Sequence, residues 1–342
     1  MQNNKHNLES HWGKSLRRLP WDNGEPALSQ ALISSTVHEW YDAKHRETSQ
    51  DEIDLINSIE VKACPYCGSE KFIKDGYNDG IQRYRCKECK GRFSPLTNTI
   101  FDSKKIPISE WIEYLFHLFE FHSIVTSARD NRNAETTGKY WLVKTFEILR
   151  NIQKDVILSG RIYFDEMFFP VIKRKTVMND GKKLRGISRN KIAVACAFDE
   201  VGQMVIIVED TSKPSHKSTW EAMGNHIKEG SCLVHDGESS HDVLVERLNL
   251  TSEVYATDQT KGLSDKENPL DPINDLHSLA KRFMKAHGGY DRSNLQDWMN
   301  LIWFILSEPR NRYEKVDLFI NLAINSPARV KYRDVFRKKS AK

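Results

Sequence analysis

The chain has 342 residues, 39% hydrophobic and 29% charged, as in a globular protein with two or three domains. Its 51 basic and 47 acidic residues leave a formal net charge of only +4, so a nucleic-acid partner has to be inferred from local basic clusters. No apolar run reaches the roughly 18 residues that span a bilayer, and the N-terminus lacks the hydrophobic core of a secretory signal. We therefore expect a cytoplasmic protein without a membrane partner, whose six cysteines bind metal or lie in the core rather than form disulfides.

The first 60 residues are polar and contain no recognisable site. Apolar side chains recur at helical spacing in residues 27–41 and 51–59. The sequence therefore predicts a helical N-terminal region, residues 1–60.

Residues 61–95 contain two matched cysteine pairs. Each pair is C-x2-C, with eighteen residues between the pairs: Cys64, Cys67, Cys86 and Cys89. Two such knuckles bring four thiolates around a tetrahedral Zn²⁺. Gly68 and Gly91 follow the pairs, where we expect turns with positive φ, and residues 82–85 alternate like a hairpin strand. These features predict a zinc ribbon with a structural zinc ion.

Basic side chains are frequent around the second knuckle. They are Arg83, Arg85, Lys87, Lys90 and Arg92. A zinc ribbon need not bind DNA, because many such modules only hold a fold together. The cluster nevertheless favours a nucleic-acid-binding surface.

After a linker at residues 95–107, three helical segments are expected in the part of the chain from 96 to 155. They are residues 110–121 with Ser109 as the N-cap, residues 123–130, and residues 136–149 with Thr136 or Thr137 as the cap. Three short helices with polar turns fit a DNA-binding helix-turn-helix. They fit a generic helical bundle almost equally well.

From residue 160 the pattern becomes rich in strands. Residues 161–173, RIYFDEMFFPVIK, read as a buried strand interrupted by Asp165 and Glu166. Neighbouring strand residues face opposite sides, so only one of these acids can point into a given site. An acid in mid-strand needs compensation, such as a metal ion or a hydrogen-bond partner. The alternative is a carboxylate on a solvated edge strand.

A basic loop follows this strand. Between residues 173 and 191 a single acid, Asp180, accompanies eight cations: Lys173, Arg174, Lys175, Lys182, Lys183, Arg185, Arg189 and Lys191. A solvated hairpin is the ordinary explanation. Beside a phosphate-processing site, the same density would hold a nucleic-acid backbone.

The following elements are expected in the order βββαβαβα, counting the first strand. The further strands are residues 191–198, 203–208, 231–235 and 253–256, and the helices are residues 219–228, 241–248 and 273–286. Cys196 and Cys232 lie within apolar strands and are expected in the core. If a parallel fourth strand extends a three-stranded antiparallel sheet, the fourth strand lies beside the first. Asp165 and Asp236 would then share a cluster of Mg²⁺ or Mn²⁺ ions, the hard cations that carboxylates prefer, and two such ions support phosphodiester cleavage.

The helix after Pro272 has a polar face and an apolar face. Asn274, His277 and Lys281 share the polar face at i, i+3 and i+7. Asn274 or His277 could complete the metal site, and Lys281 could hold a phosphate. A solvated helix face is the alternative.

Taken together, residues 61–310 resemble the ISXO2-like insertion-sequence transposases, which carry an N-terminal zinc ribbon. The matching segments are CPYCGS…RYRCKECKGRFSPLTNTIF, YFDEMFF, RGISRNKIAVACAFD, CLVHDGESSH and PINDLHSLAKRFM…GGYDRSNLQDWMN. The resemblance implies an α+β multidomain chain in which residues 156–310 form an RNase H-like, retroviral-integrase-type DDE domain, followed by a basic tail at 311–342. Asp165 and Asp236 match the first two acids, and Asn274 and Lys281 match the asparagine variant of the third motif. His277 stands where the glutamate variant has its acid, which leaves the identity of the third ligand open.

The resemblance also implies an activity and partners. The enzyme would cleave double-stranded DNA at the terminal inverted repeats of the element and join the ends to target DNA, as at least a dimer, in the bacterial nucleoid. Asp165, Asp236 and Asn274 would hold Mg²⁺ or Mn²⁺, with His277 and Lys281 as further catalytic residues. Two alternatives share these residues: a non-catalytic, zinc-dependent DNA-binding regulator, and a metal-dependent nuclease that does not join strands.

Overall fold

The chain forms two compact units. The computed structural model describes residues 47–171, 176–184, 186–288 and 290–336. The first unit comprises the described residues up to Pro95 together with Ser103–Glu113, and the second comprises Leu96–Asp102 and the described residues from Tyr114 onward. The predicted helix at residues 27–41 lies outside the described residues, as do Lys173, Arg174, Lys175 and Arg185.

The first unit contains the expected ribbon. Strands β1 (Phe72–Asn78), β2 (Ile81–Cys86) and β3 (Arg92–Phe93) form an antiparallel sheet, and helix α3 (Gln50–Ser58) precedes it. Ser49 caps α3 by accepting a hydrogen bond from the backbone of Glu52. Three aromatic rings, Phe72, Tyr84 and Phe93, pack at centroid distances of 5.5 to 5.6 Å and fill the small core beside the cysteines.

The two glycines after the knuckles serve different purposes. Gly68 has φ +74°, as expected for the turn. At the second knuckle the positive φ of 62° falls on Lys90 instead of Gly91. Gly91 is required by close packing, because a Cβ there would lie 2.7 Å from the ring of Tyr66. The expectation of positive φ at Gly91 is therefore wrong.

The three helices predicted after the linker are α4 (Ile108–Phe119), α5 (Ile124–Asp130) and α6 (Glu135–Leu149). Their caps differ in part from the expectation. Ser123 caps α5, but Ser109 lies inside α4, where its N–H donates to the buried carboxylate of Glu52 at 3.2 Å. Helix α6 begins after Ala134, which places both Thr136 and Thr137 in its first turn.

The second unit is built on a five-stranded mixed sheet in the order β10-β9-β4-β7-β8. The strands are β4 (Arg161–Pro170), β7 (Lys191–Asp199), β8 (Met204–Thr211), β9 (Cys232–His235) and β10 (Thr251–Val254). Pairing is antiparallel from β4 through β7 to β8 and parallel from β4 through β9 to β10. The fourth long strand therefore lies beside the first, as the sequence predicts. The basic loop contains a small hairpin, β5 (Met178–Asn179) and β6 (Lys182–Lys183).

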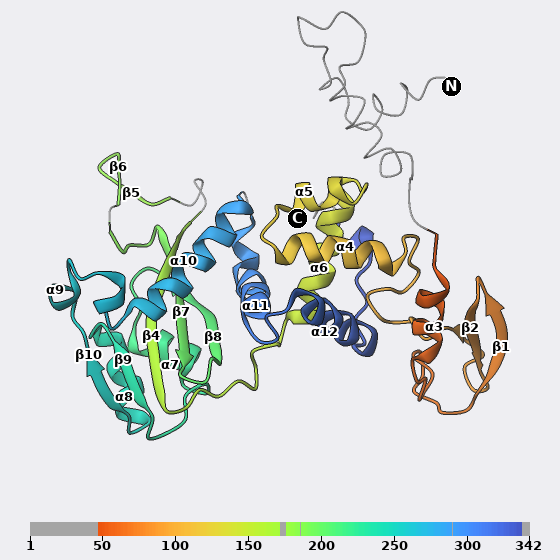
Figure 1. Cartoon of the computed structure of the whole chain (residues 1–342), viewed down its shortest axis with the longest axis horizontal. Helices are drawn as coiled ribbons and strands as arrows, with labels where there is room; N and C mark the ends of the chain where they lie inside the picture. The colour runs from red at the N-terminus through yellow and green to blue at the C-terminus, as the bar shows by residue number, and fades with distance from the viewer. Residues whose placement is uncertain (1–46, 172–175, 185, 289, 337–342) are drawn as a thin grey trace, which may run out of the picture. The chain divides into compact units, whose positions relative to one another are not determined.

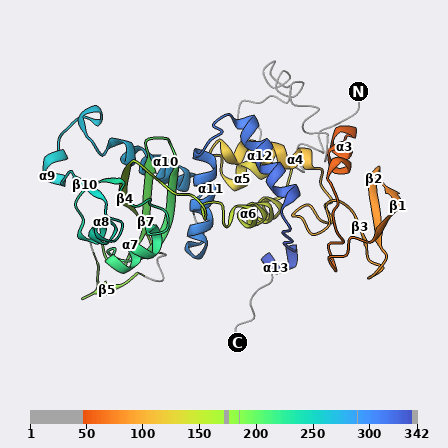
Figure 2. The ribbon, with the colours of Figure 1, turned by 90° about the horizontal axis from the view of Figure 1, so that it is seen from below.

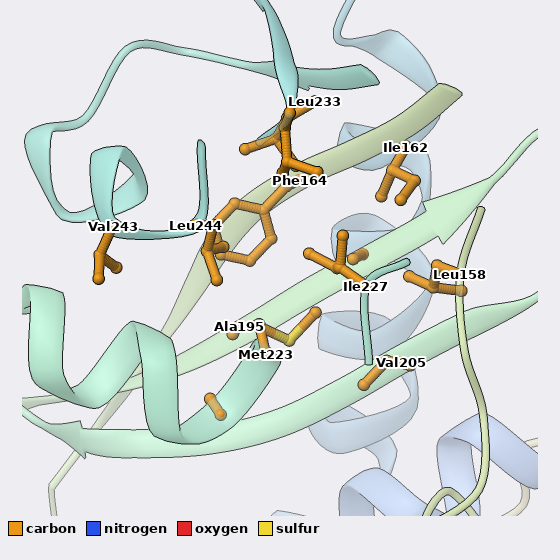
Figure 3. Close-up of a cluster of buried hydrophobic side chains, with 13 residues drawn as sticks. Leu158, Ile162, Phe164, Ala195, Val205, Met223, Ile227, Leu233, Val243 and Leu244 are labelled. Atoms are coloured by element: carbon orange, nitrogen blue, oxygen red, sulfur yellow. The ribbon is translucent and has the colours of Figure 1, made fainter. Parts of the chain in front are cut away.

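Helices cover both faces of the sheet. Helices α7 (His216–Met223) and α8 (Asp242–Arg247) lie on one face, and α10 (Asp271–Ala286) crosses β4 and β7 on the other (Figures 1 and 2). Phe164 and Ile162 of β4 point toward α7 and α8, where they pack with Met223 and Leu244 in a fully apolar core (Figure 3). At roughly 25 cal/mol per Å² of apolar surface, this burial is the main force that holds the layers together. The connecting segments include the short helix α9 (Thr257–Thr260).

The C-terminal part of the chain is helical. Helix α11 (Leu295–Leu306) packs against α6 through Phe146 and Trp298, whose ring centroids are 5.2 Å apart. Residues from 311 are not a tail, because Arg312–Asn325 forms helix α12. Its apolar residues recur at helical spacing and are buried: Val316, Phe319, Ile320, Ala323 and Ile324. A short helix, α13 (Tyr332–Phe336), follows.

Side chains occupy the open edge of strand β8. Gln153 accepts from the N–H of Ile206 at 2.7 Å and donates to the carbonyl of the same residue at 3.0 Å. Gln296 accepts from the N–H of Val208 at 2.7 Å, and the indole of Trp303 donates to the carbonyl of Met204. An unpaired strand edge invites pairing with other chains. Here α11 and the segment after α6 satisfy the edge, and they are thereby fixed to the sheet.

Replacing Gln153 by leucine tests this arrangement. The side chain is 3% exposed and also donates to Asn300 at 2.7 Å. Leucine would leave the N–H of Ile206 without a partner, whereas Oδ1 of Asn300 and the carbonyl of Ile206 would each keep the amide of Gln296 as a donor. We therefore expect a loss of about 1 to 3 kcal/mol in the free energy of unfolding. Urea denaturation measures this loss, with Gln203→Leu in the exposed turn before β8 as the control. Equal stability of the two variants would contradict the structural role of Gln153.

Candidate active site and metal centres

Asp165 lies in the middle of β4, opposite Cys196 of β7. Its Oδ1 accepts the backbone N–H of Glu166 at 2.8 Å, and its Oδ2 lies 3.7 Å from Nδ1 of His277. Burial, together with the negative charges of Glu166 and Asp236, raises the pKa of Asp165 to about 7. A cation at this position would relieve the crowding of carboxylates.

Asp236 follows the end of β9, directly beside β4. The parallel ladder pairs Arg161 with Cys232 and Tyr163 with Val234. Extending this register by two residues aligns Asp236 with Asp165, and neighbouring strands lie about 4.8 Å apart. The carboxylate of Asp236 accepts the N–H of Glu238 at 2.9 Å, within its own turn. The negative charge of Asp236 is one of the causes that raise the pKa of Asp165.

Helix α10 brings His277 to Asp165, but not Asn274. His277 is 6% exposed, and its Nε2 is buried without a hydrogen-bond partner. Burial, together with the positive charge of Lys281, lowers the pKa of His277 to about 4, so the imidazole is neutral at pH 7. The neutral form of an imidazole is the form that can coordinate a metal ion. Asn274 lies one turn away, and its side chain is exposed.

On the opposite face of β4, Glu166 belongs to a buried polar chain that the sequence does not reveal. Its carboxylate accepts from Nε2 of His241 at 3.0 Å. His241 contacts Nδ1 of His235 at 2.9 Å, and His235 contacts the hydroxyl of Ser252 at 2.9 Å. This series of hydrogen-bonded side chains therefore links β4, β9 and β10 across the start of α8.

The protonation of the two histidines follows from their contacts. Although burial opposes it, the carboxylate of Glu166 raises the pKa of His241. Burial, together with the positive charge of His241, lowers the pKa of His235 to about 4. Nε2 of His241 donates to Glu166. Nδ1 of His235 accepts the N–H of Gly237 at 3.3 Å, so it also accepts from Nδ1 of His241, which therefore carries a proton on both ring nitrogens. This network fixes the end of β9, where His241 Nδ1 lies 3.8 Å from Asp236.

Glu209 on β8 is a second carboxyl group, after Asp165, whose pKa is raised. Both of its carboxylate oxygens are buried and lack a hydrogen-bond partner. Burial, together with the negative charge of Glu166, raises the pKa of Glu209 to about 7. Nothing in the local sequence marks Glu209, because its environment is created by the long-range pairing of strands.

The four cysteine thiols of the ribbon come together as predicted. The sulfur atoms of Cys64 and Cys89 are 3.7 Å apart, and those of Cys67 and Cys86 are 3.6 Å apart. Four sulfurs at about 2.3 Å from a zinc ion would be spaced by roughly 3.8 Å in a tetrahedron. Burial opposes ionisation of Cys86, yet the backbone N–H groups of Cys89 and Glu88 lower its pKa to about 7. The geometry and the thiol chemistry both fit zinc.

The basic residues proposed for DNA contact are at the surface where the structure describes them. Exposed cations of the ribbon and the hairpin include Arg85, Lys87, Lys182, Lys183 and Arg189, while Arg83 and Lys191 are half-buried. In the ribbon, Arg92 pairs with Asp75 at 2.9 Å. Asn190, 2% exposed, bonds both backbone groups of Val177 and closes the base of the hairpin loop.

Among the described residues, no helix is both long and apolar enough to cross a membrane. No protein-family model matches the chain. A sequence comparison finds an uncharacterized protein in the transposable element ISH50 of Halobacterium salinarum, 21% identical over 246 residues, covering 69% of this chain and 82% of the relative.

Similar solved structures include a pre-cleavage Mos1 transpososome and a Mos1 mariner paired-end complex with Mn. The first has a TM-score of 0.24 at 9% identity and covers 64% of this chain and 78% of that one. The second has a TM-score of 0.23 at 12% identity and covers 58% and 73%. Scores at this level do not establish a common overall fold.

Glu209→Gln is expected to change how stability depends on pH. A carboxyl group whose pKa is raised on folding binds its proton more tightly in the folded state, so its contribution to stability falls as pH rises from about 4.5 to about 7. The glutamine amide does not ionise, so the variant does not lose this stability as the pH rises. We expect the variant to be more stable than the wild type by about 1 to 3 kcal/mol at pH 8, and to differ little at pH 4. Chemical denaturation at both values, with the exposed Glu246→Gln as control, measures the effect, and a pH-independent difference would contradict it.

Removal of zinc is expected to unfold the ribbon. Cys86→Ser, or chelation of the wild type, should abolish protection of the β1 and β2 amides against hydrogen exchange, because small zinc modules draw their folding free energy from the metal. Cys232→Ser lies outside the cluster and serves as the control. If protection persisted after complete loss of zinc, the structural role of the metal would be refuted.

Proposed function

We propose that the protein is a DNA transposase of the DDE type, and that its motifs place it with the ISXO2-like family. The observation that carries the proposal is the register of β4 and β9, which aligns Asp236 with Asp165 beside His277. The relative from the transposable element ISH50 supports the same class of protein. The five-stranded order with a parallel β4–β9 pair is the one expected for an RNase H-like catalytic domain.

In this proposal the acids hold two Mg²⁺ or Mn²⁺ ions. When bound, such ions lower the pKa of a water nucleophile and stabilise the leaving oxygen. Asp165 and Asp236 provide carboxylate oxygens, and His277, whose Nδ1 lies 3.7 Å from Oδ2 of Asp165, provides the third ligand in preference to Asn274. This choice rests on burial, because His277 faces Asp165 while Asn274 is exposed. Lys281, one turn further along α10, holds a phosphate oxygen of the DNA.

Double-stranded DNA is the proposed partner. The ribbon, helices α4 to α6 and the exposed cations of the β5–β6 hairpin would bind the terminal inverted repeats and the target. These contacts are to phosphates, so their contribution to affinity should fall steeply with salt. Two ends cut in concert require at least two chains. The protein would act in the cytoplasm, on the nucleoid.

The test is cleavage of a duplex that carries the inverted repeats bounding the gene, in Mg²⁺ or Mn²⁺. We expect Asp165→Asn and Asp236→Asn each to reduce nicking by a factor on the order of 10² to 10³, as when one charge-stabilising group is removed from an active site. Asp210→Asn, an exposed aspartate on β8, is the matched control. Undiminished nicking by both site variants would refute the assignment.

The same assay distinguishes the related functions. A joined product with target DNA identifies a transposase, and cleavage without joining identifies a nuclease. DNA binding without Mn²⁺ binding, measured by calorimetry, identifies a regulator. His277→Ala should weaken Mn²⁺ binding more than Asn274→Ala does, and the reverse order would assign the third ligand to Asn274.

A further inference from the structure

A group of metal-ligand side chains in the second unit shares no residue with either of the two centres described above. His117 near the end of α4, His122 after it and Asp130 at the end of α5 place one ligand atom each within 4.8 Å of one another. We propose that these three residues form a third metal site, specific for a divalent transition-metal ion of the Zn²⁺ type. The argument for this site does not depend on the transposase function proposed above.

The backbone explains why the two histidines meet. Phe121 has φ +69°, its N–H donates to the carbonyl of Leu118, and the N–H of His122 donates to the carbonyl of His117 at 3.0 Å. This is the Schellman ending of a helix, in which the side chains at the positions of His117 and His122 are brought into contact. Apolar residues usually form this contact. Here it is formed by two imidazoles whose ring centroids are 5.1 Å apart.

The imidazoles lack the partners that buried nitrogens require. Nδ1 of His117 and Nδ1 of His122 are both buried without a hydrogen-bond partner. The nearest oxygen of Asp130 is 3.7 Å from His117 Nδ1, which is too long for a hydrogen bond. Ligands at about 2.0 to 2.2 Å from a zinc ion in tetrahedral geometry are spaced by roughly 3.4 Å. One ion between these atoms would satisfy all three groups with a small adjustment.

The donor set determines the class of ion. Two imidazoles and one carboxylate suit Zn²⁺, Co²⁺ or Ni²⁺ better than Mg²⁺, which prefers oxygen ligands. The intervening Phe121 packs edge-on against Phe283 of α10, with ring centroids 5.0 Å apart. An ion at this turn would therefore stabilise the packing of Phe121 against α10, the helix that carries His277.

Metal content of the full-length protein tests the proposal. After removal of loosely bound ions, elemental analysis should find one zinc ion fewer per chain in His117→Asn and in His122→Asn than in the wild type. His216→Asn, an exposed histidine outside all three groups of metal ligands, should retain the wild-type content. Equal zinc content in all four proteins would overturn the proposal and leave an ordinary His117–Asp130 ion pair.

Cobalt separates this site from the ribbon. Co²⁺ on four thiolates gives strong sulfur-to-metal charge-transfer absorption, whereas Co²⁺ on nitrogen and oxygen ligands gives only weak visible bands. We expect His122→Asn to lose the weak component and keep the thiolate absorption, which also reports that the ribbon remains folded. Asp130→Asn, with near-UV circular dichroism to show that the second unit is folded, should reduce the same component. Titrations in which only the thiolate component ever appears would overturn the proposal.

Discussion

The structure of the second unit depends on one pairing, the parallel ladder between β4 and β9. Strand β4 lies at the centre of the sheet and bonds to β7 on its other side, so its position is fixed from both edges. The register then decides which residue stands beside Asp165. A shift by one residue would turn every side chain of a strand to the opposite face. Precision at the candidate site therefore comes from the same hydrogen bonds that build the core.

Successive side chains of β4 point to opposite faces of the sheet, so its two adjacent acids lie in different environments. Asp165 faces α10 and its neutral histidine, while Glu166 is neutralised by protonated His241 on the other face. A buried carboxylate with a charged partner and further hydrogen bonds is tolerated. The buried hydrogen-bond network from Glu166 to Ser252 thus allows β4 to contain two adjacent acids and still be the central strand of the sheet. It also fixes the turn that holds Asp236.

The ribbon and the sheet domain are stabilised by different physics. The ribbon has a small core of three aromatic rings beside its cysteines, and a metal ion held by the cysteine cluster would add to its order. The second unit buries a continuous apolar layer between the sheet and its helices. Its open edge is closed by glutamine and tryptophan side chains, which attach the helical part of the chain to β8.

Local patterns in the sequence were sufficient for the cysteine spacing, the order of strands and helices and the placement of Asp165 and Asp236 on the first and fourth long strands. These depend on residues close together in the chain, where spacing and periodicity carry the information. The contact of His277 with Asp165, the partner of Glu166, the burial of Glu209 and the helix in place of a C-terminal tail were decided only by tertiary structure. Each of these depends on which distant surfaces meet, and burial and charge that arise from such contacts leave no periodic signal along the chain.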